Sequence, residues 1–379
     1  MNRPHTFASL LLTLCVLEVA CASSEDADGY RFEVPSSFPT PRVPADNPMS
    51  EAKVQLGRRL FYDVRLSENE TQRCATCHVQ ALAFTDGRPT SVGSTGQSTA
   101  RGAMSLANAA YASTFNWANA TLTTLEEQAH IPLFGESPVE LGLGGLENLL
   151  LARLASDDRY PSMFAESFPD DANPISVQNV VRALAAFQRT LISGRSPYDQ
   201  YLAGDAEALS PAALRGRDLF FGERLECFHC HGGFNFSNSI DHAGNQFDQT
   251  VFANNGLYNV DGAGGYPADN TGLFAMTNDR LDMGRFKPPS LRNIALTSPY
   301  MHDGSLETLD DVLDHYARGG TLTTTGPNVG DGSTSPLRSG FVAGFTLTAG
   351  ERADVLAFLE ALTDEEFIHD PRYSSPFIE

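Results

Sequence analysis

One short motif, Cys-x-x-Cys-His, occurs twice in this 379-residue chain and constrains its fold more than any other feature. Two thiols three positions apart lie on one helical turn, where they can bond to the two vinyl groups of a haem, and the following histidine then lies under the iron. A redox dithiol needs no following histidine, and a four-cysteine zinc site needs its two pairs much closer together. The sequence therefore predicts two covalent c-type haems, held by Cys74, Cys77 and His78 and by Cys227, Cys230 and His231.

The first 22 residues have the pattern of a secretory signal peptide. An apolar run at 7–19 is followed by small residues up to Ala22. A run of this length is too short to cross a bilayer, which needs about 20 residues, so we expect no transmembrane segment. The pattern predicts export to the periplasm. Cleavage before Cys21 would expose a cysteine for a lipid anchor, but Glu18 interrupts the apolar stretch, so release as a soluble protein is favoured.

The chain after the signal peptide contains a repeated unit. Residues 23–48 are rich in proline and are expected to form an extended tether. A predicted helix containing Gly57–Tyr62 precedes the first haem motif, and one containing Gly216–Phe221 precedes the second. Each starts at a serine that can cap a helix, Ser50 or Ser210.

Each unit also has a predicted closing helix. Apolar residues recur at helical spacing over 177–191, and Thr348 with Glu351 forms a capping box before the apolar face that extends to Leu362. The predicted fold class is mostly α: two cytochrome c-like haem domains related by internal duplication, at 49–200 and 201–379, with long loops.

The charge of the chain limits its partners. The sequence has 47 acidic and 26 basic residues, a net charge of −21. Such a polyanion is repelled by nucleic-acid phosphates, so we exclude a nucleic-acid partner and expect a protein with a basic surface instead.

Four further segments resemble one known family. They are Leu125–Pro132 (LEEQAHIP), Pro138–Gly142 (PVELG), Phe286–Asn293 (FKPPSLRN) and Pro299–Gly304 (PYMHDG). Together with the haem motifs, they are similar to the bacterial di-haem cytochrome c peroxidase family and, within it, to the MauG-like branch. The resemblance runs from Asn47 to the C-terminus, and the ending from Leu362 to Pro376 is similar to that of the MbnH group associated with copper-binding proteins.

The resemblance implies roles around the first haem. The His78 haem would be the peroxidatic one, with Gln128 and Glu140 as the matching distal residues and Pro132 packed between them. An insertion before Pro138 leaves Glu136 as a rival to Glu140. A carboxylate beside bound peroxide can move its proton during O–O cleavage. The loop after His78 contains no histidine before His130, so this iron is expected to be permanently open.

The resemblance also implies a ligand for the second iron. The far-side ligand in the family is a methionine fourteen residues after the histidine of the Pro-Tyr-x-His motif, and Tyr316 occupies that position here, as in MauG-like proteins. Tyr316 could instead be a core aromatic in register with Leu313, in which case Met301 and His315 are the fallback ligands. A phenolate stabilises oxidised iron, whereas a thioether favours the ferrous state.

Two further expectations come from the family. Trp117, the single tryptophan, matches a residue that relays charge between the haems, although a lone tryptophan can equally be core packing. One calcium ion is expected between the domains, with backbone carbonyls of Thr297 and Pro299 and the side chain of Asn108 as ligands.

The leading functional hypothesis is a periplasmic haem peroxidase that uses hydrogen peroxide to oxidise a partner protein, at tryptophan, through a high-valent di-haem state. The first alternative is a conventional cytochrome c peroxidase that reduces peroxide with electrons from a small redox protein. The second is a non-enzymatic di-haem electron carrier.

Overall fold

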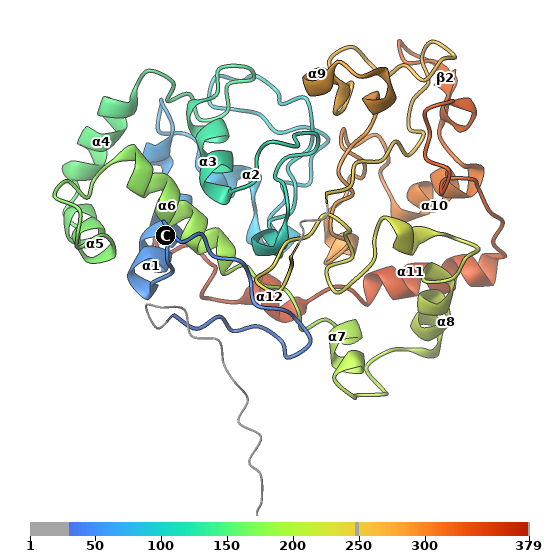
Figure 1. The fold of residues 1–379 in the computed structure, drawn as a ribbon, viewed down its shortest axis with the longest axis horizontal. Helices are drawn as coiled ribbons and strands as arrows, with labels where there is room; N and C mark the ends of the chain where they lie inside the picture. Colours follow the sequence, from blue (N-terminus) through green and yellow to red (C-terminus); the bar gives the residue numbers. More distant parts are fainter. Residues whose placement is uncertain (1–29, 247–249, 378–379) are drawn as a thin grey trace, which may run out of the picture.

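The computed structural model describes residues 30–246 and 250–377 and confirms a mostly helical chain with long loops. Two lobes lie side by side (Figure 1), one around α1 and α6 and one around α8 and α11. The longer helices are α1 (Glu51–Phe61), α3 (Leu125–Phe134), α4 (Glu147–Ala155), α5 (Tyr160–Ser167), α6 (Val177–Arg189), α8 (Pro211–Phe220), α10 (Leu309–Arg318) and α11 (Ala349–Glu360). The shorter elements are α2 (Cys74–Cys77), α7 (Pro197–Leu202), α9 (Phe274–Thr277), α12 (Glu365–His369), β1 (Leu322–Thr323) and β2 (Gly330–Asp331).

A glycine allows the two main helices of the first lobe to cross at close range. Helix α1 begins at its N-cap Ser50 and carries Gly57 against α6. A Cβ atom on Gly57 would lie only 1.9 Å from the carbonyl oxygen of Ala183. One turn further along each helix, the rings of Phe61 and Phe187 pack together, with their centroids 5.3 Å apart.

The second lobe repeats this crossing. Helix α8 begins at its N-cap Ser210 and carries Gly216 against α11, where a Cβ atom would lie 1.9 Å from the carbonyl oxygen of Asp354. The rings of Phe220 and Phe358 follow one turn later, 5.4 Å apart. The same arrangement of glycine, close carbonyl and phenylalanine pair therefore occurs in both halves, as an internal duplication predicts.

The C-terminal segment returns to the first lobe after α11 (Figure 1). The Tyr62 hydroxyl donates a hydrogen bond to the carbonyl oxygen of Tyr373 (2.6 Å), and the Arg58 Nε donates to that of Ser374 (2.7 Å). The domain boundary at residue 200 stays a prediction. The segment that begins with α12 belongs to the second half of the sequence but packs against the first lobe.

The Pro-rich segment is also bound to the lobes. Residues 30–48 contain no helix or strand, as expected, but Phe38 is buried. Its ring lies 4.9 Å from that of Phe234 and 4.6 Å from the guanidinium of Arg292. The predicted signal peptide and Cys21 lie outside the described residues.

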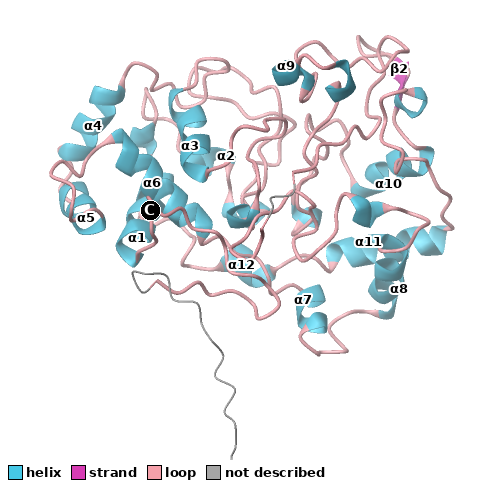
Figure 2. Ribbon diagram, in the orientation of Figure 1, coloured by secondary structure: helices cyan, strands magenta, loops and turns pink. Residues whose placement is uncertain are grey.

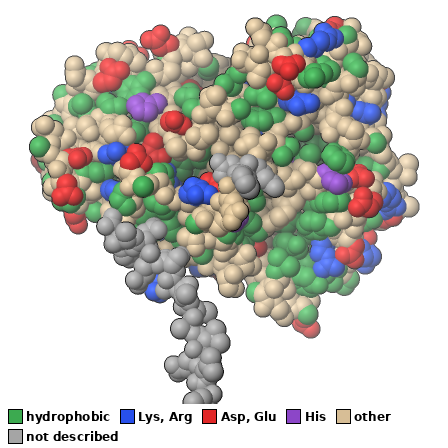
Figure 3. All heavy atoms as spheres, viewed as in Figure 1, with side chains coloured by type: hydrophobic (Ala, Val, Ile, Leu, Met, Phe, Trp, Pro, Cys, Tyr) green, Lys and Arg blue, Asp and Glu red, His purple; other side chains and the backbone are tan. Residues whose placement is uncertain are grey.

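Loops fill much of the space between the helices (Figure 2). The only strands in the described ranges, β1 and β2, form one antiparallel pair. No helix in residues 30–246 or 250–377 is long and apolar enough to cross a membrane. Acidic side chains occur on both lobes of the face in Figure 3, interspersed with Lys and Arg, as the net charge of −21 suggests.

Replacement of Gly216 by alanine should destabilise the fold, although alanine is the better helix former. The new methyl group would meet the backbone of Asp354, and overpacking of this kind costs about 1–3 kcal/mol. Gly350, in the first turn of α11, has open space around its Cβ position, so Gly350→Ala should be neutral or stabilise by up to about 1 kcal/mol. Chemical denaturation followed by circular dichroism measures both, and equal effects would contradict the close crossing.

Candidate functional site

The first haem motif forms a single helical turn. Helix α2 consists of Cys74–Cys77, and His78 follows as its C-cap. The His78 Nδ1 lies 2.8 Å from the carbonyl oxygen of Phe84, which adopts a left-handed conformation (φ 62°). Since a carbonyl only accepts, Nδ1 carries the proton, and Nε2 is the nitrogen left to bind a metal.

The second motif is held in the same way. A 3₁₀ turn spans Cys227–His229, and the His231 Nδ1 lies 3.2 Å from the carbonyl oxygen of Phe236 and 3.1 Å from that of Pro289. Phe236 is also left-handed (φ 49°). Both histidines are therefore oriented by a carbonyl a few residues downstream, with Nε2 available to an iron.

The cysteines are in environments that suit thioethers better than free thiolates. Burial raises the pKa of Cys74 and of Cys227 to about 12. A nucleophilic or zinc-binding cysteine requires a lowered pKa, because its thiolate is the reactive form. The environments therefore argue against the dithiol and zinc alternatives.

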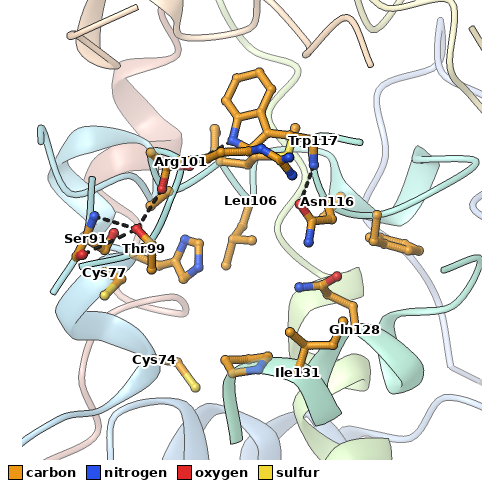
Figure 4. A pocket seen from close by; sticks show the side chains of 18 of the residues that line it. Cys74, Cys77, Ser91, Thr99, Arg101, Leu106, Asn116, Trp117, Gln128 and Ile131 are labelled. Atoms are coloured by element: carbon orange, nitrogen blue, oxygen red, sulfur yellow. Dashed lines mark hydrogen bonds between the residues drawn. The ribbon is translucent and has the colours of Figure 1, made fainter. Parts of the chain in front are cut away.

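A cavity of about 480 Å³ lies beside the first motif and is lined by both halves of the chain. This volume is in the usual range of ligand sites, roughly 300–1,000 Å³. Figure 4 shows Cys74 and Cys77 on one side, Gln128 and Ile131 on the facing side, and Trp117 above. The lining from the second half includes Ser237, Lys287, Pro288, Pro289 and Ser290.

The predicted distal residues line this cavity. Gln128 lies on α3, and its Oε1 is buried with no hydrogen-bond partner. Pro132, on the same helix, and Glu140 also line the cavity, whereas Glu136 is exposed and does not. The geometry thus brings Glu140, and not its rival, to the same space as Gln128. Their catalytic roles stay a prediction.

The backbone around Glu140 is held from two sides. The Leu141 N–H donates to the carbonyl oxygen of Pro132 (2.9 Å), which ties this segment to the end of α3. On the other side, Gly93 approaches so closely that a Cβ there would lie 2.0 Å from the carbonyl oxygen of Val139. Burial raises the pKa of the Glu140 carboxyl above its ordinary value. A carboxyl group in this position can accept and return a proton.

Two cations in the cavity lining have no role in the sequence analysis. Lys287 is buried, its Nζ donates to the carbonyl oxygen of Thr114, and burial lowers its pKa to about 8. Arg101 also lines the cavity, and its Nε donates to Asn270. Among the described residues neither has a carboxylate within ion-pair distance. Lys287 belongs to the Phe286–Asn293 segment that resembles the family, and this resemblance is the only feature of the sequence that pointed to Lys287 as a site residue.

Tyr316 lies on α10 close to the second haem motif. Burial raises the pKa of the Tyr316 phenol, and the nearby thiol of Cys230 raises it further. The side chain of Asn255 hydrogen-bonds to the phenol. A phenol must lose its proton to bind a metal ion. Tyr316 therefore lies near the thiols of the second haem motif, and its ligation of the iron stays a prediction.

The fallback ligands have other contacts. Met301 packs against the cluster of Leu257, Tyr266 and Phe286, and its sulfur accepts a hydrogen bond from Asn255 (3.2 Å). The Nδ1 of His315 is 2.8 Å from the Thr321 hydroxyl, and its Nε2 is buried without a partner. The unpartnered Nε2 of His315 could also bind a metal, so the choice between His315 and Tyr316 stays a prediction.

Trp117 connects the two halves of the chain. Its Nε1 donates to the carbonyl oxygen of Gly102 (2.8 Å), and its own carbonyl oxygen accepts from the Lys287 N–H (2.8 Å). The indole lines the cavity and packs against a cluster that contains Tyr266 and Phe286. This placement suits a relay, which stays a prediction.

The calcium site is the least supported of the predicted sites. The Asn108 Oδ1 accepts a hydrogen bond from the Ser193 N–H (2.8 Å), and its Nδ2 donates to Ser193 and Asn235. The oxygen proposed as a ligand is therefore already used within the protein. Calcium at Thr297 and Pro299 stays a prediction.

The residues present fit a c-type haem. The cavity joins a turn with two cysteines, a histidine whose Nδ1 is held by a backbone carbonyl, and the unpartnered acceptor of Gln128. A buried ammonium without an anion is costly, so Lys287 also calls for a negative group such as a haem propionate.

Comparisons with known proteins agree with this site. A family model described as di-haem cytochrome c peroxidase matches residues 51–207. The methylamine utilization protein MauG of Methylorubrum extorquens is 34% identical, over 91% of this chain and 88% of that protein. The cytochrome-c peroxidase IdrP1 of Denitromonas iodatirespirans is 33% identical, over 96% of this chain and 95% of that protein.

Solved structures give the same result. The crystal structure of a MauG-like protein associated with microbial copper homeostasis matches with a TM-score of 0.90 and 50% identity, over 92% of this chain and 99% of that one. The diheme peroxidase BthA from Burkholderia thailandensis matches with a TM-score of 0.66 at 20% identity, over 87% of this chain and 91% of that one, which supports the fold. The chain belongs to the di-haem cytochrome c peroxidase family, in its MauG-like branch, and is a haem peroxidase with two c-type haems that acts on hydrogen peroxide.

Proposed function

We propose that this peroxidase works in the periplasm and uses hydrogen peroxide to oxidise a partner protein, at tryptophan, rather than to drain electrons from a small carrier. The observation that carries the proposal is Tyr316 beside the second haem motif. A hard anionic ligand stabilises oxidised iron, so a centre with this ligand is a poor store of reducing electrons but a good site for oxidising equivalents. The predicted signal peptide supports export.

The bound haems supply the redox chemistry, and this chain's own residues handle protons and position peroxide. The Gln128 Oε1 is an acceptor without a protein partner and can take a hydrogen bond from peroxide in the cavity. The Glu140 carboxylate takes the proton of one peroxide oxygen and returns it to the other, so that one oxygen leaves as water. The raised pKa of Glu140 makes its carboxylate a stronger base, which favours uptake of the proton.

Trp117 is the proposed path between the two centres. It lines the cavity of the first motif and packs against side chains from the second half of the chain. An electron can therefore pass through the indole without crossing water. The partner protein in turn supplies the electrons that restore the resting enzyme.

The most similar relative described above suggests the kind of partner. At 50% identity, the MauG-like protein associated with microbial copper homeostasis supports a partner with a role in copper handling. The test is to incubate the di-haem protein with peroxide and with exported proteins encoded beside it. Mass spectrometry should find added oxygen or cross-links at tryptophan. Peroxide turnover with a small cytochrome as donor, and no modified partner, would favour the conventional peroxidase.

Glu140→Gln should slow the reaction with peroxide by roughly 10²–10⁴-fold while leaving haem attachment intact, because a carboxamide cannot accept the proton. In the wild type the rate should fall as the pH drops through a pKa above the ordinary value of about 4.3, since the carboxylate is the active form and burial raises its pKa. Stopped-flow spectroscopy measures both effects. Glu136→Gln is the matched control, and a loss of rate there alone would reverse the assignment.

Tyr316→Met should raise the reduction potential of the second haem, within the range of about 0.8 V that axial ligands control, because a thioether favours ferrous iron. Spectroelectrochemical titration measures the potential of each haem. Met301→Leu tests the fallback ligand and should leave this potential unchanged. A potential that responds to Met301→Leu and not to Tyr316→Met would remove the basis of the proposal.

A further inference from the structure

Two tyrosines, Tyr266 and Tyr258, continue from the cluster around Trp117 toward the surface. Trp117 packs against the cluster that contains Tyr266, whose ring lies 6.1 Å from that of Phe286. The ring of Tyr258 lies 5.6 Å from that of Tyr266, edge to face. Tyr266 is buried, whereas Tyr258 is only partly buried, so the series leads outward. Trp117 is the single tryptophan, so an oxidising equivalent that leaves it through the protein must use other side chains, and tyrosine is next in ease of oxidation.

The hydroxyl of Tyr258 has a proton acceptor in place. It donates to the Oδ2 of Asp303 at 2.7 Å, a distance suited to proton transfer. A tyrosine loses its phenolic proton when it gives up an electron, so a carboxylate at this distance makes the oxidation easier.

The carboxylate of Asp303 is not neutralised by a neighbouring cation. Its nearest basic neighbour is the Nε2 of His302, 3.9 Å away. Burial lowers the pKa of His302 to about 4, so that ring is uncharged at neutral pH. No Lys or Arg forms an ion pair with Asp303 in the described part of the chain. Among the described residues, the Tyr258 hydroxyl therefore has no Lys or Arg competing with it for the Oδ2 of Asp303.

The other tyrosine that donates to a carboxylate, among the described residues, is a useful contrast. Tyr160 donates to Asp63 at 2.6 Å, but Asp63 is already paired with Arg65 at 2.7 Å. Tyr160 is also fully buried in the core of the first lobe, apart from the cluster around Trp117. The Tyr258 pair differs in three ways. Its carboxylate has no Lys or Arg partner among the described residues, it packs against the same cluster as Trp117, and it is partly exposed.

We propose that Tyr258 is a redox-active residue that receives an oxidising equivalent from Trp117 through Tyr266 and holds it near the surface, with Asp303 as the proton acceptor. Tyr258 gives one electron to the oxidised Trp117 and its phenolic proton to Asp303, which leaves a neutral tyrosyl radical and a neutral carboxylic acid. Hydrogen peroxide is the oxidant. One electron from the partner, with the proton returned by Asp303, restores the tyrosine. The inference rests on the proposed function, because it gives the route by which the partner is oxidised.

The test uses the di-haem protein with hydrogen peroxide and no partner, frozen at successive times for electron paramagnetic resonance. The wild type should give a tyrosyl radical signal that Tyr258→Phe abolishes. Tyr160→Phe, the matched control, should retain it. Asp303→Asn, which keeps the shape but not the base, should slow radical formation roughly 100-fold. An unchanged resting haem spectrum in each variant shows that the fold is intact.

A wild type that consumes peroxide without a tyrosyl signal, or a signal that persists in Tyr258→Phe, would overturn the inference. The proposed function is scored separately by mass spectrometry of the partner. Partner oxidation that proceeds at the wild-type rate in Tyr258→Phe overturns the inference and leaves the function standing. A Tyr258 radical with no partner modification supports the inference and removes the function.

Discussion

The close crossing of two helices at a glycine is the contact on which each lobe depends. Gly57 and Gly216 let the backbones of the paired helices meet without an intervening side chain. One turn later each crossing packs a phenylalanine pair, and in the first lobe Phe61 also lies 6.4 Å from the ring of His78. A larger residue at either glycine would push the helices apart, because packed cores have little room to adjust. The position of each haem motif thus follows from a backbone contact some distance away in the chain.

Each histidine is fixed by a carbonyl that a left-handed phenylalanine presents. Phe84 and Phe236 hold this conformation although it is unfavourable for a side chain with a Cβ, and the surrounding packing has to stabilise it. The carbonyl contact at Nδ1 fixes the tautomer of His78 and of His231, so that Nε2 is the nitrogen that would bind a metal. The two halves therefore share the histidine of the haem motif and also the backbone carbonyl contact that orients its ring.

The two lobes are joined by contacts that the linear chain does not suggest. Residues 30–48 lie against both lobes, and the segment after α11 returns to the first. The cavity beside His78 takes part of its wall from the second half, and Trp117 packs against that half as well. The roles proposed for Glu140 and Trp117 therefore depend on how the lobes meet.

The haem motifs, the helices with their serine caps, the duplication and the family could all be read from the sequence, because each rests on short spacings or local hydrogen bonds. The absence of Glu136 from the cavity lining, the buried Lys287 and the pairing of Tyr258 with Asp303 could not. These features depend on which loops pack together in the fold, and loops without periodicity carry no signal of their distant contacts. The sequence alone determined that the chain can attach two haems. Tertiary packing decided which side chains lie around the haem motifs.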